Sequence, residues 1–190
     1  MRPQERIEEL KRERNAVILA HNYQVPEIQD IADYVGDSLG LALQASKTDA
    51  DVIVFCGVDF MAESAKILNP DKVVLHPEPM AKCPMAAMCT VDGIKMLKKD
   101  FPKADVVAYV NTSAECKAEA DVCCTSSNAV KVIDSLESDI VIFIPDENLA
   151  SCSQRETDKG IIMWPGYCPT HDSITKEKIE ALKKEHPVAV

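Results

Sequence analysis

The sequence predicts an α/β fold in which a parallel sheet covered by helices on both faces forms a unit that is repeated. Short, continuous apolar runs are typical of strands buried on both faces of a parallel sheet. Segments with helical spacing of apolar residues separate these runs, as in βαβ units. Several landmarks also recur at offsets of 85 to 89 residues along the 190-residue chain. Together these observations predict three-layer αβα units.

The expected elements follow one another in a regular order. The polar N-terminal segment should form the first helix, and Pro26 suits the first turn of the next helix. Apolar positions of that helix recur every three or four residues, at Ile28, Ile31, Ala32 and Val35. The apolar runs predict strands at residues 16–20, 52–55, 73–75, 106–110, 140–144 and 161–164.

The recurring landmarks predict two units, at residues 1–102 and 103–190. The matched pairs are Asn22 with Asn111, Ser38 with Ser126, Phe55 with Phe143, and Cys83-Pro84 with Cys168-Pro169. The helical segment around Leu182 repeats the one around Leu97, which leads into a strand. We therefore expect that the chain stops at the start of a third unit, which is absent from it.

Composition and charge limit the classes of partner. The formal net charge of −10 argues against nucleic acid or an anionic membrane surface as a partner. The N-terminus lacks the apolar segment of a signal peptide, and no apolar run approaches the ~20 residues of a membrane span. We expect a soluble, cytoplasmic protein that acts on small molecules.

Eight cysteines are many for a protein of the cytoplasm, where disulfides are rare. They can be buried apolar residues, reactive thiols or metal ligands. Only Cys83 and Cys168 recur in the repeat, each before a proline in an expected loop. Cys89 is expected in a buried helix and Cys123-Cys124 in the core, whereas Cys56, Cys116 and Cys152 have no repeat partner. One cysteine from each of three units would hold a four-iron cluster and leave one iron open as a Lewis acid for dehydration.

Polar residues follow the predicted strands at the edge where parallel α/β sheets bind ligands. His21 and Tyr23 come after the first strand and suit acid–base chemistry on a carbonyl or imine, although a histidine there can also simply bind a backbone carbonyl. Tyr109 and Asn111 come at the end of the equivalent strand. Taken alone, Tyr109 is more simply a core residue, whereas the match of Asn111 to Asn22 indicates either a ligand contact or a shared requirement of the turn.

Two serines are expected at helix N-termini, Ser38 after Gly36-Asp37 and Ser126 after Thr125. Serine at this position commonly caps the helix. The same geometry, with unused N–H groups beside a hydroxyl, also binds phosphate or carboxylate. Both interpretations remain open from the residues alone.

Several motifs together resemble the quinolinate synthase family from the first helix to the last residue. They are Ala20-His21-Asn22-Tyr23-Gln24, Gly36-Asp37-Ser38-Leu39, Asp59-Phe60-Met61-Ala62-Glu63, Cys83-Pro84-Met85-Ala86, Tyr109-Val110-Asn111-Thr112, Thr125-Ser126-Ser127-Asn128-Ala129 and Trp164-Pro165-Gly166-Tyr167-Cys168. The resemblance implies three similar αβα domains around a pseudo-threefold axis, with a [4Fe-4S] cluster held by one cysteine from each.

The resemblance also implies an activity and the residues that serve it. The family condenses iminosuccinate (iminoaspartate) with dihydroxyacetone phosphate, losing phosphate and water, to make quinolinate for NAD biosynthesis. L-aspartate oxidase or aspartate dehydrogenase would act upstream. By motif, Cys83 and Cys168 resemble two cluster ligands, and His21 and Tyr23 resemble residues beside the reacting carbons. The residues that resemble contacts to substrate carboxylates and phosphate are His21, Ser38, Tyr109, Val110, Asn111 and Ser126.

The third cysteine ligand implied by the family is absent with its domain, so we expect this chain alone to be inactive. Two other functions remain open from the sequence. One is a different iron–sulfur hydro-lyase, which would share the open iron but not the Tyr-Val-Asn and Thr-Ser-Ser contexts. The other is a non-catalytic metal-binding remnant.

Overall fold

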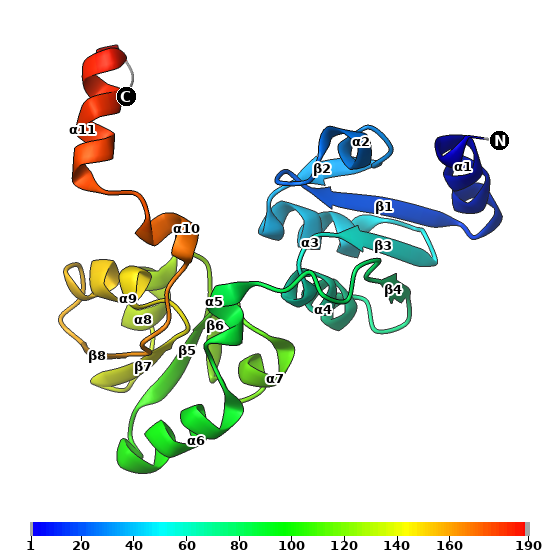
Figure 1. The fold of residues 1–190 in the computed structure, drawn as a ribbon. Coiled ribbons are helices and arrows are strands. Elements are labelled where there is room, and N and C mark those ends of the chain that lie inside the picture. Colours follow the sequence, from blue (N-terminus) through cyan, green and yellow to red (C-terminus); the bar gives the residue numbers. More distant parts are fainter. Residues whose placement is uncertain (1, 189–190) are drawn as a thin grey trace. The chain divides into compact units, whose positions relative to one another are not determined.

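The computed structural model describes residues 2–188, which form two compact units (Figure 1). The first unit ends at Cys83 and the second begins at Pro84. Each contains one four-stranded sheet whose neighbouring strands are all parallel. The predicted α/β class with parallel sheets is therefore confirmed. The predicted repeat boundary after residue 102 remains a prediction about where the duplicated sequence begins again.

The first unit has strand order β2-β1-β3-β4. Its central strands β1 and β3 are the most buried, as their apolar runs predict. Its elements are α1 (Pro3–Glu13), β1 (Ala16–His21), α2 (Pro26–Gln29), β2 (Tyr34–Gly36), α3 (Ser38–Lys47), β3 (Val52–Cys56), α4 (Asp59–Leu68) and β4 (Val73–Leu75).

Helices cover both faces of the first sheet. Ile18 and Val54 face the side on which α1 and α2 lie, where they line a common cavity with Ile7. Because side chains alternate along a strand, Leu19 and Phe55 point to the opposite face, and both are fully buried. Helices α3 and α4 pack against each other, and α3 also packs against β1. The result is the predicted three-layer arrangement.

The second unit has strand order β6-β5-β7-β8, with helices again between the strands. Its elements are α5 (Pro84–Ala87), α6 (Val91–Asp100), β5 (Asp105–Tyr109), α7 (Ala114–Lys117), β6 (Val122–Cys124), α8 (Ala129–Asp134), β7 (Ile140–Ile144), α9 (Glu147–Gln154), β8 (Gly160–Met163), α10 (Pro169–Asp172) and α11 (Lys176–Glu185).

Two apolar clusters fill the space on either side of the second sheet. On one face, strand residues such as Val106 and Ile142 pack against Ile94 of α6 and Cys116 of α7. On the other face, Val107 and Phe143 pack in a cluster with residues of α8 and α9. Alternate residues of the same strands thus bury opposite faces, which explains why these strands read as continuous apolar runs.

The sheet register confirms the duplication and places its offset at 88 residues. Leu19 pairs with Tyr34 and with Phe55, and 88 residues later Val107 pairs with Val122 and with Phe143. One side-chain bond repeats in the same way. Asp33 Oδ2 accepts the Ile18 N–H at 2.7 Å, and Asp121 Oδ2 accepts the Val106 N–H at 2.8 Å.

This register corrects one landmark of the sequence comparison. At an offset of 88, Asn22 corresponds to Val110, and both N–H groups donate to the last residue of the neighbouring strand, at 3.0 and 2.9 Å. His21 therefore corresponds to Tyr109, and Asn111 lies one residue beyond the match that its identity to Asn22 suggested. Two sheets can share a register where their sequences share no residue, because backbone hydrogen bonds determine it.

Other local predictions were also wrong. The helix expected over Ile28 to Val35 ends at Gln29, and Val35 lies in the three-residue strand β2. The matching strand β6 contains Cys123 and Cys124, of which only Cys124 is buried. Cys89 is buried as predicted, but it lies between α5 and α6 and not in a helix.

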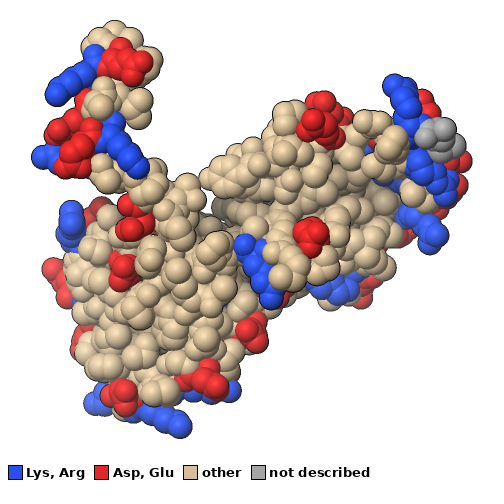
Figure 2. Space-filling model, in the orientation of Figure 1, with Lys and Arg blue, Asp and Glu red and all other residues tan. Residues whose placement is uncertain are grey.

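The surface carries charges of both signs. Acidic and basic side chains alternate on α11 and are mixed on α1 (Figure 2), where Arg6 and Glu9 form an exposed ion pair at 2.6 Å. Within residues 2–188, none of the helices combines the length and apolar character needed to cross a membrane. The strand expected after Pro187 would include residues 189 and 190, which lie outside the described residues.

Candidate active site

The carboxyl end of β1 positions His21 in the first unit. The side chain is only 6% exposed, and its Nδ1 accepts the backbone N–H of Tyr23 at 3.2 Å. With Nδ1 used as an acceptor, the proton of the neutral ring lies on Nε2, which can donate to a ligand. The interpretation that His21 only binds a backbone carbonyl is therefore wrong, because its backbone contact is with an N–H group.

Burial also determines the charge state of His21. Loss of contact with water lowers the pKa of His21 below its ordinary value, and the negative charge of Asp37 opposes this only in part. The imidazole is therefore neutral at pH 7. It can donate a hydrogen bond from Nε2 but brings no positive charge to the site.

Tyr23 lies beside His21 on a turn that leaves the strand. The turn is closed by the Gln24 N–H, which donates to the His21 carbonyl at 2.9 Å. The two ring centroids are 4.5 Å apart and the ring planes are tilted by 55°. Tyr23 is 85% exposed, so its hydroxyl adds nothing to the core of the first unit and is available to a ligand.

Helix α3 begins next to this turn, and its N-terminus combines a cap with unused donors. Asp37 is the N-cap, and its Oδ1 accepts the Gly40 N–H at 2.7 Å. Ser38 is the first helical residue, so the capping interpretation of Ser38 is wrong. Within residues 2–188 no hydrogen bond uses the N–H groups of Ser38 and Leu39 or the Ser38 hydroxyl. These three donors can bind an anion, although Asp37 reduces the positive potential there.

The equivalent strand end of the second unit carries Tyr109, Val110 and Asn111. All three are partly buried, and Tyr109 packs against the cluster that contains Phe143. The ring of Tyr109 therefore serves the core, as the alternative interpretation expected, and its remaining surface lies at the strand end. Asn111 is followed by Thr112, which is fully buried and whose Oγ1 has no hydrogen-bond partner within the described chain.

Ser126 does not open a helix as Ser38 does. Residues 126–128 form a turn, and α8 begins at Ala129 with Asn128 as its N-cap. Asn128 Oδ1 accepts the Thr125 N–H at 2.7 Å, while Thr125 Oγ1 and Ser127 Oγ lie 3.0 Å apart. Ser126 is exposed, and the turn directs the hydroxyls of its neighbours inward to one another. The match to Ser38 predicted a helix start at Ser126. The chain instead forms a turn there, which the Asn128 side chain closes.

The cysteines differ in burial, and burial determines how readily each forms a thiolate. No disulfide joins any of them within residues 2–188. Burial raises the pKa of Cys56 and Cys89, and it raises the pKa of Cys124 to about 12. Such thiols are poor sources of the thiolate that metals bind.

Cys83 and Cys168 are partly exposed and lie directly before the short helices α5 and α10. Two soft sulfur donors in accessible loops suit iron–sulfur chemistry. Within residues 2–188, no three His, Cys, Asp or Glu side chains are placed to bind one metal ion. Each of the two thiols is a suitable donor for a cluster, and the cluster itself remains a prediction.

Three residues near these sites were not singled out from the sequence. Asp37 was overlooked because Ser38 is an equally good cap in sequence, although aspartate caps helices as well as serine does. Thr112 and Trp164 gave no separate signal, since their roles depend on burial and on contacts distant in sequence. Two cavities, of about 670 and 430 Å³, contain none of the predicted site residues.

Comparison with known proteins matches the chain to one family. The model of the family described as "NadA: Quinolinate synthetase A protein" matches residues 5–190. The quinolinate synthase of Dehalococcoides mccartyi strain CBDB1 is 59% identical over 184 residues. Quinolinate synthase 1 of Methanosarcina acetivorans is also 59% identical, and the quinolinate synthase of Pyrococcus furiosus is 60% identical over 185 residues.

These alignments cover nearly all of the chain but not all of the relatives. They include 97% of the chain for the D. mccartyi and M. acetivorans proteins and 96% for the P. furiosus protein. The chain in turn spans 60–61% of the length of these relatives.

Proposed function

Because the chain belongs to the quinolinate synthetase A family, we propose that it forms part of an enzyme that makes quinolinate for NAD biosynthesis. The observation that carries this proposal is the match of residues 5–190 to the family. We propose iminosuccinate and dihydroxyacetone phosphate as substrates, with loss of phosphate and water. An enzyme that oxidises aspartate, either an oxidase or a dehydrogenase, would supply the first substrate.

We propose that His21 and Tyr23 act on the reacting carbons. The neutral imidazole is suited to donate from Nε2 to a carboxylate or carbonyl oxygen of a substrate, since Nδ1 is already occupied by the Tyr23 N–H. The adjacent, exposed Tyr23 hydroxyl is suited to move a proton to or from a substrate carbonyl or imine. Their ring contact keeps the two groups together on one turn.

We propose that the anionic groups of the substrates bind at the N-terminus of α3 and at the strand end of the second unit. Ser38 offers a hydroxyl beside two unused N–H groups. Asn111 and the backbone of Val110 offer polar contacts after β5, and Ser126 offers an exposed hydroxyl before α8. Uncharged donors of this kind bind an anion although the chain as a whole is acidic.

We propose that Cys83 and Cys168 hold an iron–sulfur cluster. When bound, a [4Fe-4S] cluster with one iron free of protein ligands supplies a Lewis acid for dehydration. The exposure of both thiols and their matched positions in the repeat support this assignment. Cys56, Cys89 and Cys124 are worse candidates because burial raises their pKa values.

The proposal is tested in the whole enzyme of which this chain is proposed to form part. That enzyme is reconstituted with iron and sulfide without oxygen. Cys83→Ser and Cys168→Ser should each lose most of the bound iron and all quinolinate formation. Cys123→Ser and Cys152→Ser are the matched controls, because both side chains are exposed and belong to the elements β6 and α9 rather than to the two loops. Absence of quinolinate from the wild-type protein, or full iron content in both loop variants, would contradict the proposal.

A further inference from the structure

One side chain, Trp164, connects the segments that carry the two proposed ligands. Its indole Nε1 donates to the carbonyl of Met88 at 3.1 Å across 76 residues of sequence. Met88 immediately follows α5, which begins at the residue bonded to Cys83. Trp164 itself precedes Cys168 by one short loop. The hydrogen bond therefore joins the side chain of a residue shortly before Cys168 to the backbone of a residue shortly after Cys83.

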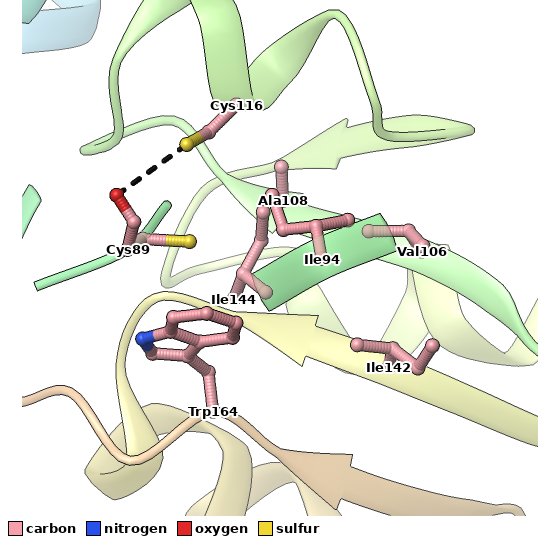
Figure 3. Close-up of a cluster of buried hydrophobic side chains, with 8 residues drawn as sticks. All are labelled: Cys89, Ile94, Val106, Ala108, Cys116, Ile142, Ile144 and Trp164. Atoms are coloured by element: carbon pink, nitrogen blue, oxygen red, sulfur yellow. Dashed lines mark hydrogen bonds between the residues drawn. The ribbon is translucent and has the colours of Figure 1, made fainter. Parts of the chain in front are cut away.

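The indole is held firmly in place. Trp164 is 8% exposed and packs with Cys89, Ile94 and Ile144 against one face of the second sheet (Figure 3). Its backbone N–H donates to the Phe143 carbonyl at 3.0 Å. Because both its backbone and its ring are held in place, Trp164 can restrain the segment that its indole N–H contacts.

Two glycines are fitted closely around this tryptophan. A Cβ on Gly93 would lie 2.3 Å from Cη2 of the indole. A Cβ on Gly166 would lie 2.4 Å from the Pro145 carbonyl oxygen, 3.1 Å from Cδ1 of the indole and 3.5 Å from Cβ of Met88. A side chain at either glycine would therefore collide with the indole or, at Gly166, with the Pro145 carbonyl, and the Met88 side chain lies within van der Waals distance of Gly166.

A second bond holds the same segment. The Cys116 thiol donates to the carbonyl of Cys89 at 3.5 Å, shown as the dashed line in Figure 3. Two consecutive carbonyls, those of Met88 and Cys89, therefore accept hydrogen bonds from side chains of other elements. The segment between α5 and α6 is tied to the second unit although it forms no regular structure there.

The fold does not require a tryptophan at this position. Counting from the matched backbone bonds that start β4 and β8, the residue of the first unit that corresponds to Trp164 is Pro77. There the same face of the sheet, covered by α1 and α2, borders a cavity of about 430 Å³. The first unit thus has the same sheet without an aromatic side chain at that place, so the contact of Trp164 with Met88 is specific to the second unit.

We propose that Trp164 is a positioning residue for the cluster ligands. It holds the backbone of residues 84–88, which follows Cys83, against the loop that leads to Cys168 before a cluster binds. Preorganised ligands lose less conformational freedom on binding, and residues behind metal ligands commonly supply this constraint. This inference rests on the proposed function, because it takes both cysteines as ligands.

The test compares Trp164→Phe with Ile142→Val in the intact protein. Phenylalanine keeps an aromatic ring in the cluster but removes the N–H donor to Met88. Ile142 belongs to the same cluster and contacts neither loop through a hydrogen bond, so its truncation controls for lost packing. Hydrogen exchange of amides 85–90 and 164–168 should quicken about tenfold in Trp164→Phe, the factor by which one lost hydrogen bond shifts a local opening equilibrium. In Ile142→Val, the exchange rates of these amides should change no more than those of the sheet amides.

Two further measurements use the same variants. In metal-free protein, alkylation of Cys83 and Cys168 should quicken in Trp164→Phe, while that of the exposed Cys123 and Cys152 stays constant. In reconstituted protein, iron should be lost to a chelator about tenfold faster in Trp164→Phe than in Ile142→Val.

Equal effects of the two variants, or faster exchange confined to the sheet, would overturn the inference. If the wild-type protein binds no iron, the proposed function fails, whereas exchange and alkylation still decide whether Trp164 positions the loops. If Trp164→Phe does not fold, Cys116→Ala removes the neighbouring bond and should show the same selective changes, about threefold in size. Absence of these changes in Cys116→Ala would then overturn the inference.

Discussion

Gly93→Ala tests the packing around Trp164 directly. Gly93 lies in the first turn of α6, after the N-cap Thr90. An added Cβ would lie 2.3 Å from Cη2 and 3.0 Å from Cζ3 of the indole, and 3.1 Å from Thr90 Oγ1. The indole cannot move aside easily, because its N–H is bonded to Met88 and its ring is buried.

Two opposing terms determine the expected change in stability. Alanine is a better helix former than glycine by about 1 kcal/mol. Forcing a methyl group into a filled core costs about 1–3 kcal/mol, and the short contact to a fixed ring favours the upper part of that range. The net change is a loss of about 1–2 kcal/mol in the free energy of unfolding. For a chain of this length that corresponds to a Tm lower by about 2–8 °C.

Thermal unfolding followed by circular dichroism measures this change. Gly40→Ala is the matched control, because it also lies near a helix N-terminus and its Cβ would meet only the Asp37 side chain, at 3.2 Å from the nearest atom. It should be neutral or slightly stabilising. The double variant Gly93→Ala/Trp164→Phe lacks the outer indole atoms, so the two losses should not add. A higher Tm for Gly93→Ala, or strict additivity in the double variant, would refute the reasoning.

Three further predictions concern the first unit. Tyr23→Phe should lower turnover by about 10²–10⁴-fold and leave the Tm unchanged, since the hydroxyl is exposed and only its proton chemistry is removed; full activity would show that the ring merely packs. Ser38→Ala should weaken binding of the phosphate substrate by about 1–3 kcal/mol in titration calorimetry. Ser46→Ala should have no effect on that binding, because its hydroxyl donates to the Leu43 carbonyl within the same helix; equal effects of the two variants would exclude the α3 site. Because burial lowers the pKa of His21, the unfolded chain binds more protons below about pH 6.5 than the folded chain, so stability should fall as the pH drops through that value. His21→Gln should flatten this dependence in denaturant titrations between pH 5 and 8, and an unchanged slope would contradict it.

The long elements were predictable because their patterns are strong. The apolar runs in β1, β5 and β7 are buried on both faces, so nearly every residue in them carries the signal. The strands β2 and β6 were missed because each has three residues and neither is an uninterrupted aliphatic run, as the equally short β4 is. Val35 then fitted a helical pattern by coincidence, and only its pairing with Ala20 identifies it as a strand residue.

For the site residues too, the sequence predicted their positions along the chain, and the structure was needed for their contacts. That His21 and Tyr23 stand at a strand end follows from the apolar run before them. That His21 is neutral follows from its burial, and the tautomer follows from its contact with the Tyr23 N–H. Asp37 in place of Ser38 as the cap, and a turn in place of a helix start at Ser126, depend on local backbone geometry that several sequences satisfy equally.

By itself the sequence determined the α/β class, the duplication, the family and the candidate cysteines, because each of these is expressed in residue types at regular spacing. The tertiary structure decided the offset of 88 residues, since register depends on which backbone groups pair across the sheets. It also decided that Trp164 joins Met88, a contact across 76 residues that no local pattern can encode. Contacts of that kind depend on how helices pack on a sheet. Packing depends on how side chains distant in sequence fit together, and they meet only in the folded chain.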